Sequence, residues 1–318
     1  MNERRYNTFG DYLRRTYGER VHKVTLDAGF TCPNRDGTKG IGGCIYCDNA
    51  GFSANSRPFR NGKSVREQLR AGIEWARRRY GARKVIAYFQ AYTNTYASLS
   101  VLKETYDQAL EFPEVVGLDI GTRADCVDKP ILDLIEGYVR SLPELWIEYG
   151  LQSSHDRTLE RINRCDTFAN FRKAVDLTRK SDVKICVHVI LGLPGETRAD
   201  MMATAESLAD LPIHGIKIHL LHLLRGTPLV DAYERGEFSL LERDEYVRLV
   251  CDFLEILPDG ILVHRLTGEA PPETLVAPEW CKDKGGVLQD IQREFTRRDT
   301  RQGCSYHGAR PTSTLAAG

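Results

Sequence analysis

The segment CPNRDGTKGIGGCIYC, Cys32 to Cys47, places three cysteines in one early loop. Cys44 and Cys47 form a C-x-x-C pair, and eleven residues separate Cys32 from Cys44. Thiolates are soft ligands that bind zinc, copper(I) or iron–sulfur clusters. A structural zinc site has four protein ligands, whereas a cluster held by three cysteines leaves one iron open for a second molecule. The loop therefore predicts an iron–sulfur site, with zinc completed by a distant Cys or His as the alternative.

Strand-like and helix-like segments alternate around this loop. We expect strands at 21–29, 84–92, 115–121, 145–151, 183–191 and 215–224, and helices at 64–80, 98–110, 129–140, 168–180, 199–211 and 242–256. Such alternation is typical of a parallel sheet with helices outside and right-handed crossovers. Six β-then-α units predict an α/β fold, a partial (β/α)6 TIM-like barrel rather than a closed eightfold one.

The alternation also suggests how the chain is divided. An N-terminal segment, 1–20, precedes the barrel core, 21–258, and a C-terminal extension, 259–318, follows it. In the extension, ILVHRLTG could add a strand and 285–298 has a helical pattern. We expect the extension to cover the mouth or the edge of the barrel.

Composition narrows the functional classes. Lys plus Arg and Asp plus Glu both total 44, so the formal net charge is zero and gives no electrostatic argument for nucleic-acid binding. The start of the chain has no apolar run typical of a secretory signal, and no stretch approaches the roughly 18 apolar residues of a membrane helix. Nine cysteines without framework spacing are expected to be reduced thiols or metal ligands, which predicts a cytoplasmic protein without a membrane partner.

Polar residues follow the predicted strands where the loops of a parallel barrel gather. Alternate residues of a strand face one side, so Glu148, Gly150 and Gln152 are expected to share a polar lumen face. Gly192 opens the turn GLPGET, which lacks the G-x-G-x-x-G dinucleotide pattern. Its Thr197 also fits a helix N-cap, which is a purely structural role. Further candidates, for which core packing is the alternative, are Arg123, Asp125, His188, His219 and His222.

Longer strings resemble a known family. KVTLDAGFTCPNRDGTKGIGGCIYC, YFQAY, GTRADCV, YGLQSSHD and GLPGET are similar to the YtqA/YhcC family of radical S-adenosylmethionine (SAM) enzymes, which is related to the Elongator catalytic subunit branch. The resemblance implies that Cys32, Cys44 and Cys47 hold a [4Fe–4S] cluster and that SAM binds its fourth iron. It also implies an electron donor such as flavodoxin or ferredoxin.

The same resemblance implies positions for cofactor contacts. Tyr46 and the turn at Gly192 correspond to adenine contacts, Gln152 and Glu148 to ribose contacts, and Arg164 to a partner for the methionine carboxylate, with Arg161 one helical turn away as its competitor. Gln90 stands where related enzymes have a glycine-rich segment that holds the methionine amino group. Because this chain lacks those glycines, simple packing of the Gln90 loop against the cluster is the alternative.

The implied activity is reductive cleavage of SAM to a 5′-deoxyadenosyl radical. For this branch the resemblance implies a tRNA substrate, in which the carboxymethylaminomethyl group on carbon 5 of a wobble uridine becomes aminomethyl. Two alternatives stay open at the level of sequence. One is a radical SAM enzyme acting on a small molecule such as a porphyrin precursor, and the other is a zinc-stabilised binding protein without catalysis.

Overall fold

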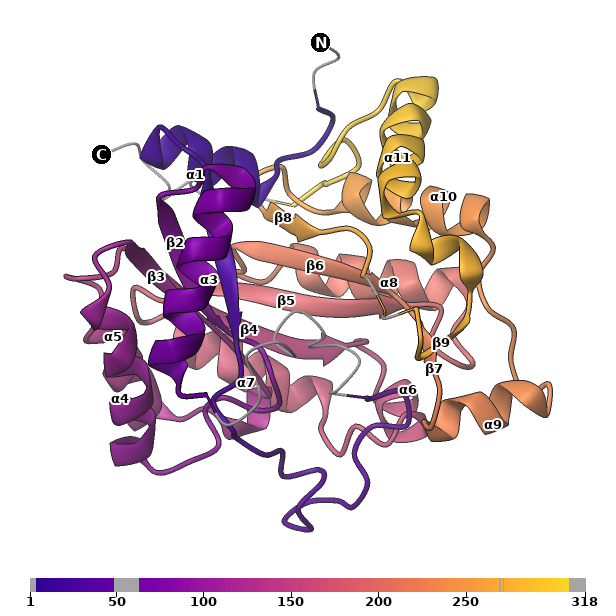
Figure 1. Ribbon diagram of the computed structural model, residues 1–318. Helices are drawn as coiled ribbons and strands as arrows, with labels where there is room; N and C mark the ends of the chain where they lie inside the picture. The colour runs from indigo at the N-terminus through magenta and orange to yellow at the C-terminus, as the bar shows by residue number, and fades with distance from the viewer. Residues whose placement is uncertain (1–3, 49–62, 269, 271, 309–318) are drawn as a thin grey trace.

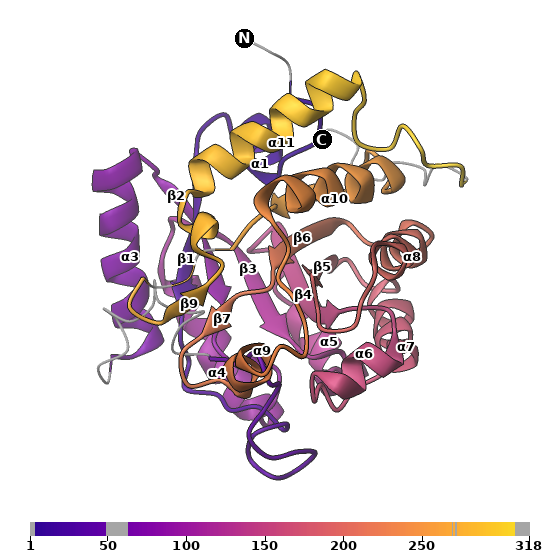
Figure 2. The same cartoon turned by 90° about the vertical axis from the view of Figure 1, so that its right-hand side faces the viewer.

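A curled, seven-stranded parallel sheet forms the centre of the molecule. The computed structural model describes residues 4–48, 63–268, 270 and 272–308. Its strands pair in the order in which they follow along the chain: β1 (Val21–Leu26), β2 (Lys84–Phe89), β3 (Val115–Thr122), β4 (Glu144–Gln152), β5 (Lys184–Leu191), β6 (Gly215–Leu220) and β8 (Leu262–Arg265). The sheet curves into a half-barrel (Figures 1 and 2). The predicted α/β class and partial TIM-like barrel are confirmed.

Helices cover the convex face of the sheet (Figure 2). They are α3 (Val65–Tyr80), α4 (Leu99–Asp107), α5 (Lys129–Glu136), α7 (Phe168–Thr178), α8 (Arg198–Ala209) and α10 (Arg243–Ile256). Local sequence fixes where two of them begin. Ser64 with Glu67, and Thr197 with Asp200, form capping boxes that satisfy the first backbone N–H groups of α3 and α8.

The ends of the chain complete the half-barrel. Strand β8 lies beyond residue 259 and pairs in parallel with β6, so the sheet has one strand more than the six predicted units. Helix α1 (Phe9–Tyr17) covers the amino ends of the strands, where Phe9 stacks on His264 of β8 with ring centroids 3.9 Å apart. Helix α11 (Lys284–Arg298) buries Val287, Ile291 and Phe295 against α10.

Shorter elements lie around the opposite, carboxyl-terminal end of the sheet. The strand expected over 215–224 breaks into β6 and β7 (Leu223–Leu224), and β7 pairs antiparallel with β9 (Leu275–Ala277). Helices α6 (Asp156–Arg161) and α9 (Pro228–Glu234) are also present, and single-turn 3-10 helices occupy Gln108–Glu111, Ala124–Cys126 and Glu279–Lys282. Within the described residues, every helix is too short or too polar to cross a membrane.

Candidate active site

A single cavity opens on the concave side of the half-barrel, and loops or strand ends from all parts of the sheet line it. Its enclosed volume is about 200 Å³. The lining residues that lie in or follow β2 to β8 include Gln90, Thr93, Thr122, Arg123, Glu148, Gln152, His188, His219, His222 and Arg265. The loop after β1 adds Cys32, Cys44, Tyr46 and Cys47. The carboxyl ends of the strands therefore meet at one site, as expected for this class of barrel.

Backbone hydrogen bonds shape the cysteine loop. The Cys32 carbonyl accepts from the Arg35 N–H at 2.8 Å, and the Cys44 carbonyl accepts from the Cys47 N–H at 2.9 Å. Gly43 has a φ of 86° and its N–H donates to the Asn34 carbonyl at 2.8 Å. A side chain at this left-handed position would also collide with Arg35. Glycine is therefore required for the loop to turn its three sulfur atoms toward the cavity.

The distances between the three sulfur atoms can be compared with those between the ligands of a single metal ion. Three sulfur ligands of one tetrahedral zinc lie about 3.8 Å apart, given a Zn–S bond of about 2.3 Å. Cys32, Cys44 and Cys47 do not come within 4.8 Å of one another as a set, and no described His, Asp or Glu joins them at that distance. As placed, the three sulfur atoms therefore do not form the ligand set of a single tetrahedral ion. Burial raises the pKa of the Cys47 thiol to about 11.

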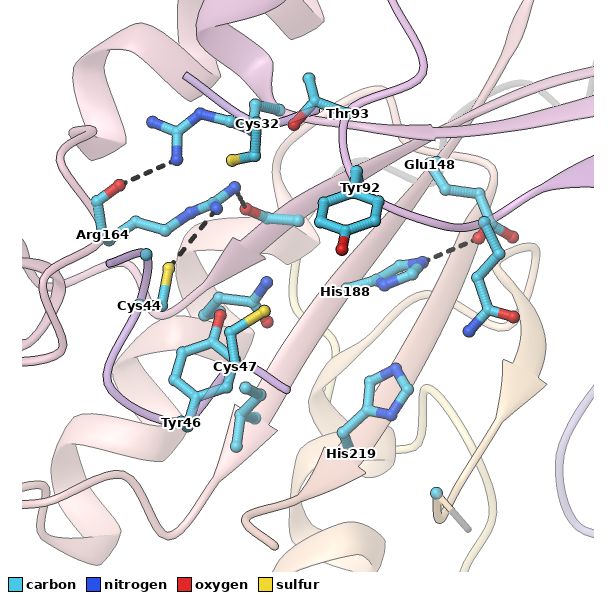
Figure 3. A pocket seen from close by; sticks show the side chains of 18 of the residues that line it. Cys32, Cys44, Tyr46, Cys47, Tyr92, Thr93, Glu148, Arg164, His188 and His219 are labelled. Atoms are coloured by element: carbon cyan, nitrogen blue, oxygen red, sulfur yellow. Dashed lines mark hydrogen bonds and ion pairs between the residues drawn. The ribbon is translucent and has the colours of Figure 1, made fainter. Parts of the chain in front are cut away.

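Arg164 and Asn34 stand next to the sulfur of Cys44. The Arg164 side chain is 7% exposed, donates to the Gly150 carbonyl, and lies 3.9 Å from Cys44 Sγ (Figure 3). Asn34 Nδ2 lies 3.7 Å from the same sulfur, and its Oδ1 is buried without a partner among the described residues. Arg161 instead extends over the turn at Gly195 and does not line the cavity. The structure therefore brings Arg164, and not its competitor, to the cysteine loop.

Glu148 lies at the floor of the cavity in a buried ionic network. It is fully buried, and Lys23, Lys217 and His188 all contact its carboxylate, His188 at 2.9 Å (Figure 3). Burial alone would raise its pKa, but Lys217 and Lys23 hold the pKa well below the usual range. A carboxylate satisfied in this way has little capacity left to accept hydrogen bonds from ribose hydroxyls. The geometry favours a supporting role for Glu148.

The other predicted contacts separate into two groups. Tyr46, Gln90 and Gln152 line the cavity, and Gln152 does so with a φ of 78° just after a register shift in β4. Gly192 is not among the lining residues. It forms the turn after β5, where its N–H lies 3.4 Å from the sulfur of Met201. This turn reaches the cavity only through its neighbour Ile190.

Sequence reasoning missed most of the charged residues in the lumen. Lys23, Asp119 and Lys217 lie on β1, β3 and β6 and form ion pairs with each other or with Glu148. Arg265, at the end of β8, also lines the cavity. The signal was available, because each is a charged residue inside an otherwise apolar strand pattern, which is costly unless the charge is paired or functional.

Two family models match the chain. The model of the radical SAM superfamily covers residues 32–208, and that of the radical SAM C-terminal domain covers residues 213–297. The first begins at Cys32 and includes β2 to β5 with their loops, and the second includes β6, β8 and α11.

Similar proteins come from bacteria and archaea. YtqA of Bacillus subtilis is 43% identical over 98% of this chain and 96% of its own length, and YhcC of Escherichia coli is 40% identical over 90% and 91%. A tRNA uridine(34) acetyltransferase of Methanocaldococcus jannaschii is 26% identical over 51% of this chain and 30% of its own. The fold is similar to that of archaeal Elp3 from Methanocaldococcus infernus, with a TM-score of 0.68, 17% identity, and coverage of 89% of this chain and 64% of that one.

Proposed function

The chain belongs to the radical SAM superfamily, in the family that contains YtqA and YhcC, and we propose that it modifies the wobble uridine of tRNA. As a member of that superfamily it is an enzyme that depends on a [4Fe–4S] cluster and on SAM. The proposed reaction converts a carboxymethylaminomethyl group on carbon 5 into an aminomethyl group. The carbon between nitrogen and carboxylate would lose a hydrogen atom to the 5′-deoxyadenosyl radical and one electron to the oxidised cluster, and water would hydrolyse the resulting C=N bond to release the two-carbon unit as glyoxylate. The cytoplasm, where tRNA and low-potential electron donors such as flavodoxin or ferredoxin occur, is the proposed compartment.

One observation carries this proposal: a single cavity has a three-cysteine loop at one end and a polar, histidine-lined lumen at the other. The similarity to a protein named tRNA uridine(34) acetyltransferase supports a wobble uridine, since that similarity covers half of this chain. When bound, the cluster and SAM supply one-electron reduction and a carbon radical that removes a hydrogen atom from the substrate.

We propose that the residues of the chain orient these groups and exclude water. Cys32, Cys44 and Cys47 would hold the cluster, and Arg164 would place a cation beside it. Tyr46, Gln90 and Gln152 are proposed cofactor contacts because all three line the cavity. Glu148 and Gly192 are proposed to have structural roles. Glu148 holds the ion pairs at the floor of the cavity, and Gly192 forms the tight turn after β5.

The basic stretches of the sequence give this proposal little support. Arg77 pairs with Glu114, Arg83 with Glu19, and Arg297 with Glu294, so these arginines are neutralised by nearby carboxylates. The charge of these stretches is therefore not available to tRNA phosphates without breaking surface ion pairs, which costs about 0–1 kcal/mol each. This observation favours the second candidate function, radical chemistry on a small molecule.

The decisive experiment compares the tRNA nucleosides of a strain that lacks the gene with those of its parent by mass spectrometry, with any parallel enzyme also deleted. We expect the aminomethyl derivative to disappear and the carboxymethylaminomethyl precursor to accumulate. Plasmid-borne wild-type protein should restore the profile, whereas Cys44→Ala should not. An unchanged profile would reject tRNA and favour the small-molecule substrate.

A further inference from the structure

The end of the cavity away from the cysteine loop is lined by histidines and an arginine. His188 comes from β5, His219 and His222 follow each other at the end of β6, and Arg265 ends β8. In Figure 3, His188 and His219 lie across the pocket from Cys32, Cys44 and Arg164. A group bound here therefore lies on the side of the cavity opposite Cys32 and Cys44 (Figure 3).

Arg265 differs from the other arginines of the cavity. Arg35 donates to the Cys47 carbonyl, Arg123 pairs with Asp125 at 2.8 Å, and Arg164 donates to the Gly150 carbonyl. Among the described residues, none forms an ion pair or a hydrogen bond with the half-buried Arg265 side chain. A guanidinium in a cleft without a protein acceptor is a common feature of anion-binding sites.

Two imidazoles beside Arg265 also lack partners. His222 is 3% exposed, and the Nε2 atoms of His219 and His222 are buried without a hydrogen bond to any described residue. The backbone of Gly268 lies against both rings, so they are packed rather than loose. Burial and the nearby charge of Arg265 lower the pKa of His222 to about 4. A neutral imidazole can present an N–H to an acceptor without adding a second full charge.

The carboxylates of the lumen do not neutralise Arg265. Asp119 is paired with Lys23, and Glu148 is contacted by Lys23 and Lys217. The two acidic groups and the two lysines balance each other within the floor of the cavity. The charge of Arg265 is thus not neutralised by these carboxylates, and its side chain lines the cavity in which the substrate has to lie.

We propose that Arg265, with His219 and His222, forms a subsite for a carboxylate carried by the substrate. The inference rests on the proposed function, because the carboxymethylaminomethyl group ends in a carboxylate and its aminomethyl product does not. The planar guanidinium fork matches a carboxylate in a bidentate arrangement, and the imidazole N–H groups can complete its hydrogen bonding. The subsite would therefore distinguish substrate from product.

The test measures whether a carboxylate shields Arg265. The full-length holoenzyme, with SAM present throughout, is labelled with phenylglyoxal, and modification of Arg265 is quantified by mass spectrometry. Three probes are compared: an anticodon stem-loop RNA with carboxymethylaminomethyluridine at the wobble position, the same RNA with aminomethyluridine, and propionate without RNA. We expect the first RNA and propionate to slow the labelling of Arg265, and the second RNA to leave it unchanged.

A matched pair of variants supplies an independent readout. Arg265→Gln should weaken binding of the carboxylate-bearing RNA by about 10- to 100-fold, the usual range for a lost charged hydrogen bond, and leave the aminomethyl RNA unaffected. Arg172→Gln, an exposed arginine on α7, should change neither affinity.

The outcomes separate the subsite from the proposed function. If the holoenzyme binds neither RNA but propionate still shields Arg265, the tRNA proposal fails and the carboxylate subsite stands. If both RNAs bind and neither carboxylate probe shields Arg265, the subsite is wrong and the tRNA proposal stands. Equal shielding by inorganic phosphate, or shielding by SAM in a separate comparison of labelling with and without SAM, would also overturn the assignment to a substrate carboxylate.

Discussion

At the scale of single residues, the Arg164 guanidinium lies 3.9 Å from the sulfur of Cys44, a predicted cluster ligand. Positive charge and N–H donors near cluster sulfur favour the reduced state and raise the reduction potential. Arg164→Gln should therefore lower the midpoint potential, which a redox titration followed by electron paramagnetic resonance can measure. The matched control is Arg161→Gln, three residues away and outside the cavity, which should leave the potential unchanged. Equal potentials for Arg164→Gln and the wild type would show that the contact has no electrostatic effect.

Individual site residues differ in how well the sequence predicts them. Cys32, Cys44 and Cys47 were identifiable because their chemistry and spacing stand out within one short loop. Arg265 carries the local signal of a charge within an apolar strand, but its lack of an ion-pair partner could not be read from the sequence, because pairing between distant segments is invisible in a linear pattern. The sequence placed Glu148 in the lumen. It did not predict that Lys23 and Lys217 pair with the Glu148 carboxylate, because these lysines lie on strands far from it along the chain.

At the scale of elements, close packing of α3 on β1 depends on Gly72. A Cβ atom at this position would collide with the methyl groups of Val24. Gly72→Ala should lower the free energy of unfolding by about 1–3 kcal/mol through overpacking, despite the better helix propensity of alanine. Urea titration gives the value, and adding Val24→Ala should restore part of it.

The control for Gly72 is the glycine of another helix. Gly10, in α1, has open space around its missing side chain, so Gly10→Ala should be neutral or stabilising by about 0.5–1 kcal/mol. If both substitutions have the same effect, then helix propensity and not packing on β1 decides the result.

His214 links the edges of β5 and β6 and makes their pairing sensitive to acid. The Ile185 N–H donates to His214 Nδ1 at 3.1 Å, and burial together with Lys184 lowers the pKa of His214 to about 4. The unfolded chain therefore takes up a proton first, near pH 6.5, so this contribution to stability is complete above 6.5 and is lost as the pH falls toward 4.

Unfolding free energies at pH 7.5 and pH 5 test this account. His214→Asn keeps an acceptor near the position of Nδ1 but cannot be protonated. Between these pH values the wild type should lose up to about 2 kcal/mol more than the variant. His307→Asn, an exposed control, should follow the wild type. If His214→Asn loses as much unfolding free energy between pH 7.5 and pH 5 as the wild type, His214 is not the source of the acid sensitivity.

The helices and strands of the βα alternation were predicted within a few residues, including the short helices α4 and α5. The capping box at Ser64 placed the start of α3 correctly. Helices α1, α6 and α9 were not foreseen, because they lie outside the βα alternation that guided the prediction. Strand β8 has four residues, and only its pairing with β6 makes it part of the sheet.

At the scale of the whole molecule, the half-barrel gathers one cavity from segments spread over most of the chain. The division into 1–20, 21–258 and 259–318 remains a proposal, and in the structure both flanking segments contact the sheet through α1 and β8. The sequence predicted the architecture because βα alternation is a local signal. It could not predict how the lumen charges pair, because that depends on the curvature that brings the strands together.

The most direct test of the account is the metal content of the full-length chain after anaerobic reconstitution, measured together with cleavage of SAM in the presence of a strong reductant. We predict iron and sulfide in equal amounts, corresponding to one [4Fe–4S] cluster per chain, and cleavage of SAM. Cys44→Ala should lose both, whereas the control Cys304→Ala, an exposed cysteine outside the cavity, should keep both. Stoichiometric zinc in place of iron, or SAM cleavage retained by Cys44→Ala, would contradict the assignment.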